Sequence, residues 1–174
     1  MNYYYLQAPT VIGELQLGAS EELREKWAKE AYNLNHSSYQ TSLYSQMSSY
    51  HVWKETKTYN KLINNIQIKI NQEYGKKQGL LKQYKYQIDE AWTAVYKEGE
   101  YAEPHHHNEY KIAFCYYIKV GQSTSPLVFD HLGFNIVPKD DMLVIFDANL
   151  VHSVPPHKGE DRIVMAGNCS LTTI

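Results

Sequence analysis

The sequence predicts an α+β protein with a mainly β core: helices in the first half, and an antiparallel sandwich or jelly roll in the second. Two helical patterns fall within the first 82 residues. From residue 83 onward, short apolar runs recur at roughly 8–12-residue spacing, separated by turn residues, which is typical of antiparallel sandwiches and jelly rolls. We therefore expect one domain over residues 1–174, with a helical part at 1–82 and a β core at 83–174.

The N-terminal part is expected to begin with a short strand and a capped helix. The strand falls near residues 10–13, and the helix covers residues 22–34. Ser20 suits an N-cap, and the acids that follow it complement the positive end of the helix dipole. Residues 35–49 are rich in Ser, Tyr, Gln and Asn, which predicts an irregular connection.

A second helix is predicted over residues 54–74. Its apolar residues recur at i, i+3, i+4 and i+7, and Gly75 follows as a suitable C-terminal stop. A stripe of this kind packs against a core far more often than it forms a binding groove. The stripe consists of Tyr59, Leu62, Ile63, Ile66, Ile70 and Tyr74.

The second half contains the apolar or alternating runs expected of strands. Gly, Pro, Asn and Asp between the runs provide turns. The expected strands are residues 87–96, 111–120, 127–129, 135–137, 142–146, 152–154 and 162–171.

Composition argues against several classes of partner and location. The net charge is −2 and the pI is near 6.4, so nothing draws the chain to nucleic acid or to an anionic membrane. No apolar window approaches the length of a membrane span, and the first residues do not resemble a signal peptide. The two cysteines, Cys115 and Cys169, lie within expected strands and are read as buried thiols. A cytoplasmic location is the expectation.

Four histidines and an arginine stand out as a candidate metal site. His105, His106 and His107 precede the apolar run at 112–118, and His152 follows the run at 142–146. Two ligands from one strand end and one from a distant strand can hold a metal on one face. Arg162, ten residues beyond His152, could bind an acid that chelates the metal. Imidazole suits iron, zinc and copper alike, so the histidines alone do not select the metal.

These motifs occur in an order that resembles a known family. Trp92 is followed by Gly-Glu-Tyr at 99–101, the histidines at 105–107 and an Ala-Phe-Cys-Tyr-Tyr-Ile strand at 113–118. A Met-Leu-Val-Ile-Phe strand then leads to His152, and Arg162-Ile163 closes the series. The tract from Trp92 to Ser170 resembles the Fe(II)/2-oxoglutarate-dependent oxygenases, and more closely a small branch of them found in marine bacteria and phages. If the chain is of phage origin, its location is the host cytoplasm.

The resemblance implies a fold, a reaction and a set of site residues. The fold would be a double-stranded β-helix (jelly roll) with the N-terminal helices packed on one sheet. The reaction would couple 2-oxoglutarate decarboxylation to oxidation, by hydroxylation, of a C–H bond. His105, His107 and His152 would bind Fe(II), and Arg162 with Tyr117 would bind the distal carboxylate of 2-oxoglutarate. Asn168 shares a strand face with Arg162 by alternation, which adds it to the residues expected to line the cofactor cleft.

One departure from the family pattern leaves the third ligand open. The common triad is His-x-Asp/Glu…His, whereas the aligned register gives His105-x-His107. His107-Asn108-Glu109 offers His-x-Glu in an overlapping frame, so Glu109 competes with His105. His106 should point away from its neighbours in an extended segment. Asp130 is a candidate ligand only if the register fails.

Other functions remain compatible with the sequence. A cupin-like dioxygenase with three histidines needs no 2-oxoglutarate and no arginine at position 162. A metal-binding structural or phage-assembly module would have no turnover. For the leading interpretation the partners are O2 and a small molecule or protein side chain, which the sequence does not identify. The helical half is expected either to shape the cleft or to form a homodimer contact.

Overall fold

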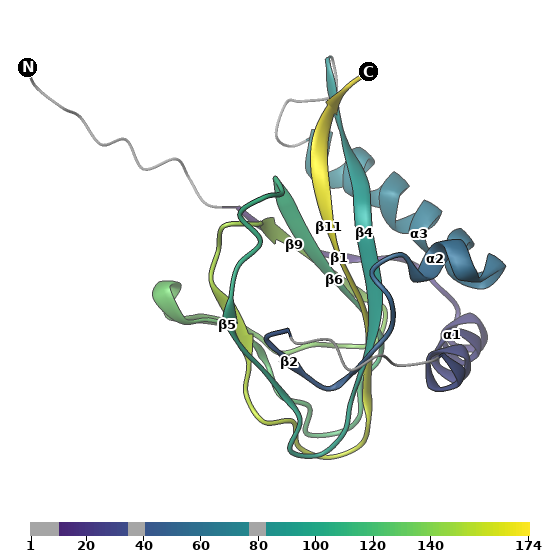
Figure 1. Ribbon diagram of the computed structural model, residues 1–174, viewed down its shortest axis with the longest axis vertical. Helices are drawn as coiled ribbons and strands as arrows, with labels where there is room; N and C mark the ends of the chain where they lie inside the picture. Colours follow the sequence, from purple (N-terminus) through teal and green to yellow (C-terminus); the bar gives the residue numbers. More distant parts are fainter. Residues whose placement is uncertain (1–10, 35–40, 77–82) are drawn as a thin grey trace, which may run out of the picture.

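The structure, a computed structural model, contains two antiparallel β-sheets packed face to face, with helices on the outer face of the larger sheet (Figure 1). It describes residues 11–34, 41–76 and 83–174. This arrangement confirms the predicted α+β class and the jelly-roll architecture. No helix in these three segments is long and apolar enough to cross a membrane.

The larger sheet has six strands in the described segments, in the spatial order β1-β9-β6-β11-β4-β3. All neighbouring strands are antiparallel. Helices cover one face and the second sheet covers the other, which explains why β6 is an almost unbroken apolar run rather than an alternating one. The strands are β1 (Ile12–Gln16), β3 (Gln46–Met47), β4 (Tyr84–Tyr96), β6 (Ile112–Lys119), β9 (Met142–Asp147) and β11 (Arg162–Thr173).

The smaller sheet has the order β2-β5-β10-β7-β8. From β4 onward the chain alternates between the sheets, so that β5, β7 with β8, and β10 each return to the smaller sheet before the next strand joins the larger one. This alternation is the winding expected of a double-stranded β-helix. The strands are β2 (Leu43–Tyr44), β5 (Tyr101–His105), β7 (Leu127–Phe129), β8 (Phe134–Ile136) and β10 (His152–Val154).

The first predicted helix is confirmed, and the second is interrupted. Helix α1 spans Glu21–Asn33, and the Ser20 hydroxyl accepts a hydrogen bond from the Leu23 amide. The expected helix at 54–74 is instead α2 (Val52–Glu55), α3 (Lys57–Lys69) and a π-helical turn at Ile70–Gly75. Thr56 separates α2 from α3 because its backbone is extended and its hydroxyl caps the Tyr59 amide.

Strands β2, β3 and β5 do not appear among the predicted elements. Residues 35–40 of the expected irregular connection lie outside the described residues, but β2 and β3 form within its remainder. A two-residue strand forms only by hydrogen bonding to a neighbouring strand, and it is too short to show a pattern of alternating apolar residues. Strand β5 contains Pro104, which argues against a strand unless it lies at an edge or a strand end.

Two hydrophobic cores lie on opposite faces of the larger sheet. Alternate residues of β6 divide between them: Phe114 and Tyr116 pack toward the helices, whereas Cys115 and Tyr117 face the smaller sheet. The core between the sheets contains several small residues, which leave space for a cavity. These are Ala94, Ala102, Ala113, Cys115 and Val164.

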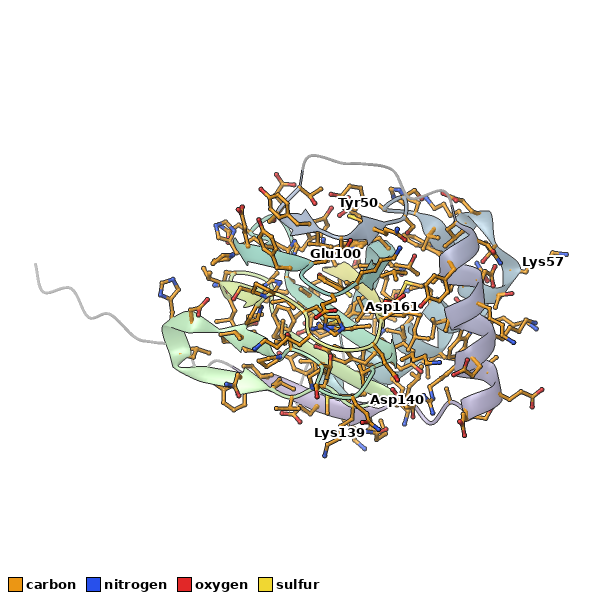
Figure 2. All side chains as sticks on the ribbon, turned by 90° about the horizontal axis from the view of Figure 1, so that it is seen from below. Tyr50, Lys57, Glu100, Lys139, Asp140 and Asp161 are labelled. Atoms are coloured by element: carbon orange, nitrogen blue, oxygen red, sulfur yellow. The ribbon has the colours of Figure 1, made fainter. Side chains whose placement is uncertain are left out.

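One end of the sandwich is closed by two turns that hydrogen-bond to each other. The Gly99 amide donates to the His157 carbonyl, and the His157 amide donates to the Glu100 carbonyl. Figure 2, a view from below, shows Glu100 and Asp161 in these turns, while Lys57 marks the helical side. His157 in the second of these turns is 1% exposed, and its Nε2 lies 2.6 Å from the Glu160 carbonyl oxygen. The histidine triplet begins at the last residue of β5, away from this closed end.

Candidate metal centre and adjoining cavities

Three histidines from two paired strands converge at one point. His105 ends β5 and His152 begins β10, and the two residues are direct partners in the antiparallel ladder. His107 follows two residues after His105. The ligand atoms of all three lie within 4.8 Å of one another, and among the described residues they form the group suited to a metal ion. The geometry therefore brings together the three histidines predicted as ligands.

Backbone carbonyls orient two of these rings. Nδ1 of His105 lies 2.6 Å from the Glu103 carbonyl oxygen, and Nδ1 of His152 lies 2.9 Å from that of Leu150. Because a carbonyl oxygen only accepts, Nδ1 of each ring carries the proton and donates it. Nε2 is then left with a free lone pair, the form of imidazole that binds metals.

Burial keeps the three rings neutral. It lowers the pKa of His152 to about 3 and that of His107 to about 4, with smaller contributions from the neighbouring histidines. The pKa of His105 is lowered for the same reason, partly offset by its hydrogen bond to the Glu103 carbonyl. Neutral histidines need not lose a proton before binding a cation, so the triad is prepared for metal at neutral pH.

The competing residues lie outside this group. His106 and Glu109 are exposed, and both line a groove on the outer side of the histidines. Asp130 accepts a hydrogen bond from the Ser153 hydroxyl at the end of β7. The convergent group therefore contains imidazoles and no carboxylate, unlike the common His-x-Asp/Glu…His arrangement.

Arg162 lies buried at the inner end of the site. It is 1% exposed, and its guanidinium stands over the rings of Tyr96 and Tyr117, with the central carbon 5.1 and 5.0 Å from the ring centres. One terminal nitrogen donates to the Ser125 carbonyl at 2.9 Å, whereas Nε has no partner among the described residues. A buried guanidinium without a carboxylate partner is costly unless a ligand anion pairs with it.

Tyr117 lies beside Arg162. Its side chain is fully buried in the core between the sheets, and its hydroxyl has no nitrogen or oxygen partner within the described part of the chain; its neighbour for hydrogen bonding is the Cys115 thiol, a weak partner. Burial raises the pKa of this hydroxyl well above its usual value, so the group stays protonated and can donate. Tyr117 thus contacts Arg162 through its ring, although it is not among the residues that line the inner cavity.

Two cavities meet at the histidines. An inner cavity of about 50 Å³ extends between the sheets from His152 past Ala113 and Cys115 to Arg162. An outer groove of about 520 Å³ is lined by Tyr50, Glu90 and Asn168 together with the loop at 106–110. His105, His107 and Trp92 line both spaces. The histidines therefore stand at the boundary between a narrow apolar interior and an open polar mouth.

Asn168 belongs to the outer groove rather than to the inner cavity. It shares the inward face of β11 with Arg162, as alternation predicts, but it lies at the other end of that face, where Nδ2 donates to Glu90 at 3.2 Å. The six residues that separate it from Arg162 span roughly 20 Å of strand. The alternation of side chains along the strand therefore predicted the correct face for Asn168. Its distance from Arg162 along the strand places it in a different space from Arg162.

Three residues of the site were missed or underrated from sequence. Trp92, which is not among the predicted site residues, lines both cavities, and its ring lies 6.1 Å from that of His107. Tyr96 contacts Arg162, and the same alternation along β4 that points Trp92 inward could have identified it. Ser125 contributes a backbone carbonyl and had no sequence signal.

The sequence matches no family model and no curated protein. Solved structures are similar in fold. A viral collagen prolyl hydroxylase from Paramecium bursaria Chlorella virus-1, in complex with 2-oxoglutarate, aligns with a TM-score of 0.70 at 17% identity, over 91% of this chain and 94% of that one. The chain has the fold of the 2-oxoglutarate-Fe(II) oxygenases.

Two further structures extend this likeness. A Pseudomonas putida prolyl-4-hydroxylase aligns with a TM-score of 0.64 at 17% identity, over 91% of each chain. HygX from Streptomyces hygroscopicus, with nickel and 2-oxoglutarate bound, gives 0.68 at 8% identity, over 92% of this chain and 83% of that one. The predicted superfamily fold is confirmed. The marine and phage branch stays a prediction.

Proposed function

We propose that this protein is an Fe(II)/2-oxoglutarate-dependent oxygenase that hydroxylates its substrate. The observation that carries the proposal is the combination of a neutral three-histidine group with a buried arginine that has no carboxylate partner among the described residues, at the end of the same cavity. A dicarboxylic keto acid could bind the metal through its 2-oxo acid end and reach Arg162 with its distal carboxylate. The neighbours with 2-oxoglutarate bound support this cosubstrate.

The residues divide into three roles in this proposal. His105, His107 and His152 bind the metal on one face and leave the opposite positions open. Arg162 and Tyr117 hold the distal carboxylate and orient the keto acid, and the apolar walls exclude water around it. When bound, iron and 2-oxoglutarate supply the activation of O2, with release of succinate and CO2 and insertion of one oxygen atom into a substrate C–H bond.

Succinate formation tests the proposal. The protein is incubated aerobically with Fe(II), ascorbate and 2-oxoglutarate, and succinate is measured with and without substrate candidates. We expect succinate above a metal-free control, and 2-oxoglutarate binding that depends on Arg162. Absence of both would refute the assignment. A crystal soaked with Fe(II) and 2-oxoglutarate would test the ligand set and the cosubstrate contacts together.

The all-imidazole ligand set favours one alternative, a three-histidine dioxygenase that does not use 2-oxoglutarate. Such a site binds the metal without an anionic protein ligand and does not need the buried arginine. O2 consumption that is independent of 2-oxoglutarate and unaffected in Arg162→Gln would support this alternative over the proposal.

A further inference from the structure

The outer groove is negatively charged. Two carboxylates, Glu90 and Glu109, are among its lining residues, and no lysine or arginine of the described chain lines it. The inner cavity is positively charged instead, because Arg162 is its charged lining residue. A ligand that extends from one space into the other would therefore meet cationic protein at its inner end and anionic protein at its outer end.

Glu90 is held by neutral groups rather than by a cation. It accepts hydrogen bonds from Asn168 Nδ2, at 3.2 Å, and from the Tyr110 side chain. The ion pairs found in the described segments, Arg24–Asp140 and Lys119–Glu25, do not involve it. A carboxylate has about four acceptor positions, so Glu90 keeps capacity for a ligand donor.

A β-bulge shapes this part of the groove wall. In the β4–β11 ladder, Asn168 pairs with Glu90 and the next residue, Cys169, pairs with Ile88, which leaves Asp89 without a ladder partner. The extra residue lets Ile88 remain in the core beside the helices while Glu90 faces the groove. Bulges commonly redirect side chains in this way beside functional sites.

Asn168 supplies a second, independent observation in the groove wall. It is 2% exposed, and its Oδ1 has no hydrogen-bond partner among the described residues. The amide cannot be reversed to satisfy this oxygen, because the Glu90 carboxylate requires the Nδ2 donor to face it. A buried acceptor left unpaired is costly, and a ligand N–H donor beside Glu90 would satisfy it.

Aromatic rings also line the outer groove near Glu90. Tyr50 and Trp92 line the groove, with ring centres 5.3 Å apart in an edge-to-face arrangement, and Tyr110 lines it as well. Tyr50 comes from the segment between β3 and α2 and is labelled in Figure 2. Aromatic faces attract cations, most strongly where water is partly excluded.

We propose that the outer groove binds a protonated amine of the substrate, with Glu90 and Asn168 Oδ1 as acceptors and Glu109 adding attraction at the mouth. The substrate class is thus an alkylammonium compound, either a small amine or a lysine side chain. This inference rests on the proposed function, because it takes the groove at the metal centre as the place where the substrate binds.

Binding of n-butylammonium to the metal-free protein tests the inference, with n-butanol and butyrate as neutral and anionic probes. Omitting metal prevents the amine from acting as a metal ligand, and omitting 2-oxoglutarate separates this test from the test of oxygenase activity. The readout is the indole N–H signal of Trp92 in NMR spectra, assigned with Trp92→Phe. We expect saturable shifts with the ammonium, with affinity about tenfold above that for n-butanol.

Substitutions separate a specific site from general attraction. Glu90→Gln keeps the shape and the hydrogen-bond acceptor, and should weaken n-butylammonium binding about tenfold. Glu109→Gln, at an exposed position where folding is not at risk, should weaken it by a smaller factor. Glu98→Gln, an exposed carboxylate in the turn after β4 that is not a groove residue, is the matched control and should change nothing.

Three results would overturn the inference: no saturable Trp92 shift with n-butylammonium, equal or tighter binding of n-butanol or butyrate, or unchanged affinity in both glutamate variants. Nα-acetyl-lysine methylamide distinguishes the two sources of the amine. Tighter binding than n-butylammonium supports the ammonium site and assigns it to lysine side chains, whereas weaker binding supports the site and assigns it to small amines.

Discussion

The two spaces on either side of the histidines differ in nearly every physical property. The inner cavity is narrow, bounded mostly by apolar side chains, and ends at a buried arginine. The outer groove is wide, polar and lined by carboxylates. A cavity with fixed walls and one charged anchor suits a single invariant ligand, whereas an open polar groove can be altered through loop residues without disturbing the core. We therefore associate the interior with the cosubstrate and the mouth with the substrate.

The largest expected effect comes from the histidines that separate the two spaces. His152→Ala should reduce Fe(II) affinity on the order of 100-fold or more and abolish succinate formation, because it removes one of three ligands. Anaerobic titration calorimetry measures the affinity. His106→Ala is the matched control and should bind metal normally. If Glu109→Ala loses metal while His105→Ala retains it, the ligand set is His107, Glu109 and His152 instead.

Substitution of Arg162 tests the role of the inner cavity in 2-oxoglutarate binding, separately from metal binding. Arg162→Lys keeps a positive charge but loses the planar pair of donors, so we expect 2-oxoglutarate binding to weaken by about 10- to 100-fold while metal affinity changes little. The comparison uses 2-oxoglutarate titrations at saturating metal. Equal losses of metal and 2-oxoglutarate affinity would indicate that Arg162 supports the fold of the site rather than the cosubstrate.

The depressed histidine pKa values predict how stability depends on pH. The unfolded chain protonates these residues near pH 6.5, while the folded, metal-free protein holds His107 and His152 neutral down to about pH 4 and 3. Below pH 6.5 the unfolded state binds more protons, so the free energy of unfolding should fall as the pH decreases toward 3, by up to ~1.4 kcal/mol per pH unit for each histidine.

Urea unfolding of the metal-free protein between pH 7.5 and about 4.5 measures how the free energy of unfolding changes with pH. This range isolates the histidines, because carboxyl groups titrate at lower pH. His152→Asn, which cannot be protonated, should reduce the slope below pH 6.5 relative to the unsubstituted protein. An identical slope in both would show that His152 is not kept neutral by the fold.

Tyr117→Phe should have the smallest effect. The hydroxyl has no nitrogen or oxygen partner within the described segments, and the Cys115 thiol beside it is a weak one, so its removal should change the free energy of unfolding by less than about 0.5 kcal/mol. Loss of one hydrogen bond to the distal carboxylate should weaken 2-oxoglutarate binding roughly 3- to 10-fold. Thermal unfolding with and without 2-oxoglutarate measures both. Destabilisation in the absence of 2-oxoglutarate would contradict an unpaired hydroxyl.

Long, regular patterns in the sequence were sufficient to predict the main elements. The capped helix at Glu21–Asn33 and the long strands β4, β6, β9 and β11 follow from periodicity and turn residues, because their side chains alternate between core and surface or between two cores. The short strands β2, β3 and β5 could not be predicted, because they depend on pairing with distant strands. Thr56 divides a continuous helical pattern through a local hydrogen bond that competes with the helix.

By itself, the sequence determined which chemistry could occur and along which segments: three imidazoles, a distant arginine, and the strand faces that carry Arg162, Tyr117 and Asn168. Only the tertiary structure decided the distances. It paired His105 with His152 across two strands, buried Arg162 without a carboxylate partner, and placed Asn168 beside Glu90 in the outer groove. Alternation fixes the face of a strand to which a side chain points, because it is a local property of the backbone. Which residues meet across that face depends on the pairing and packing of segments distant in sequence.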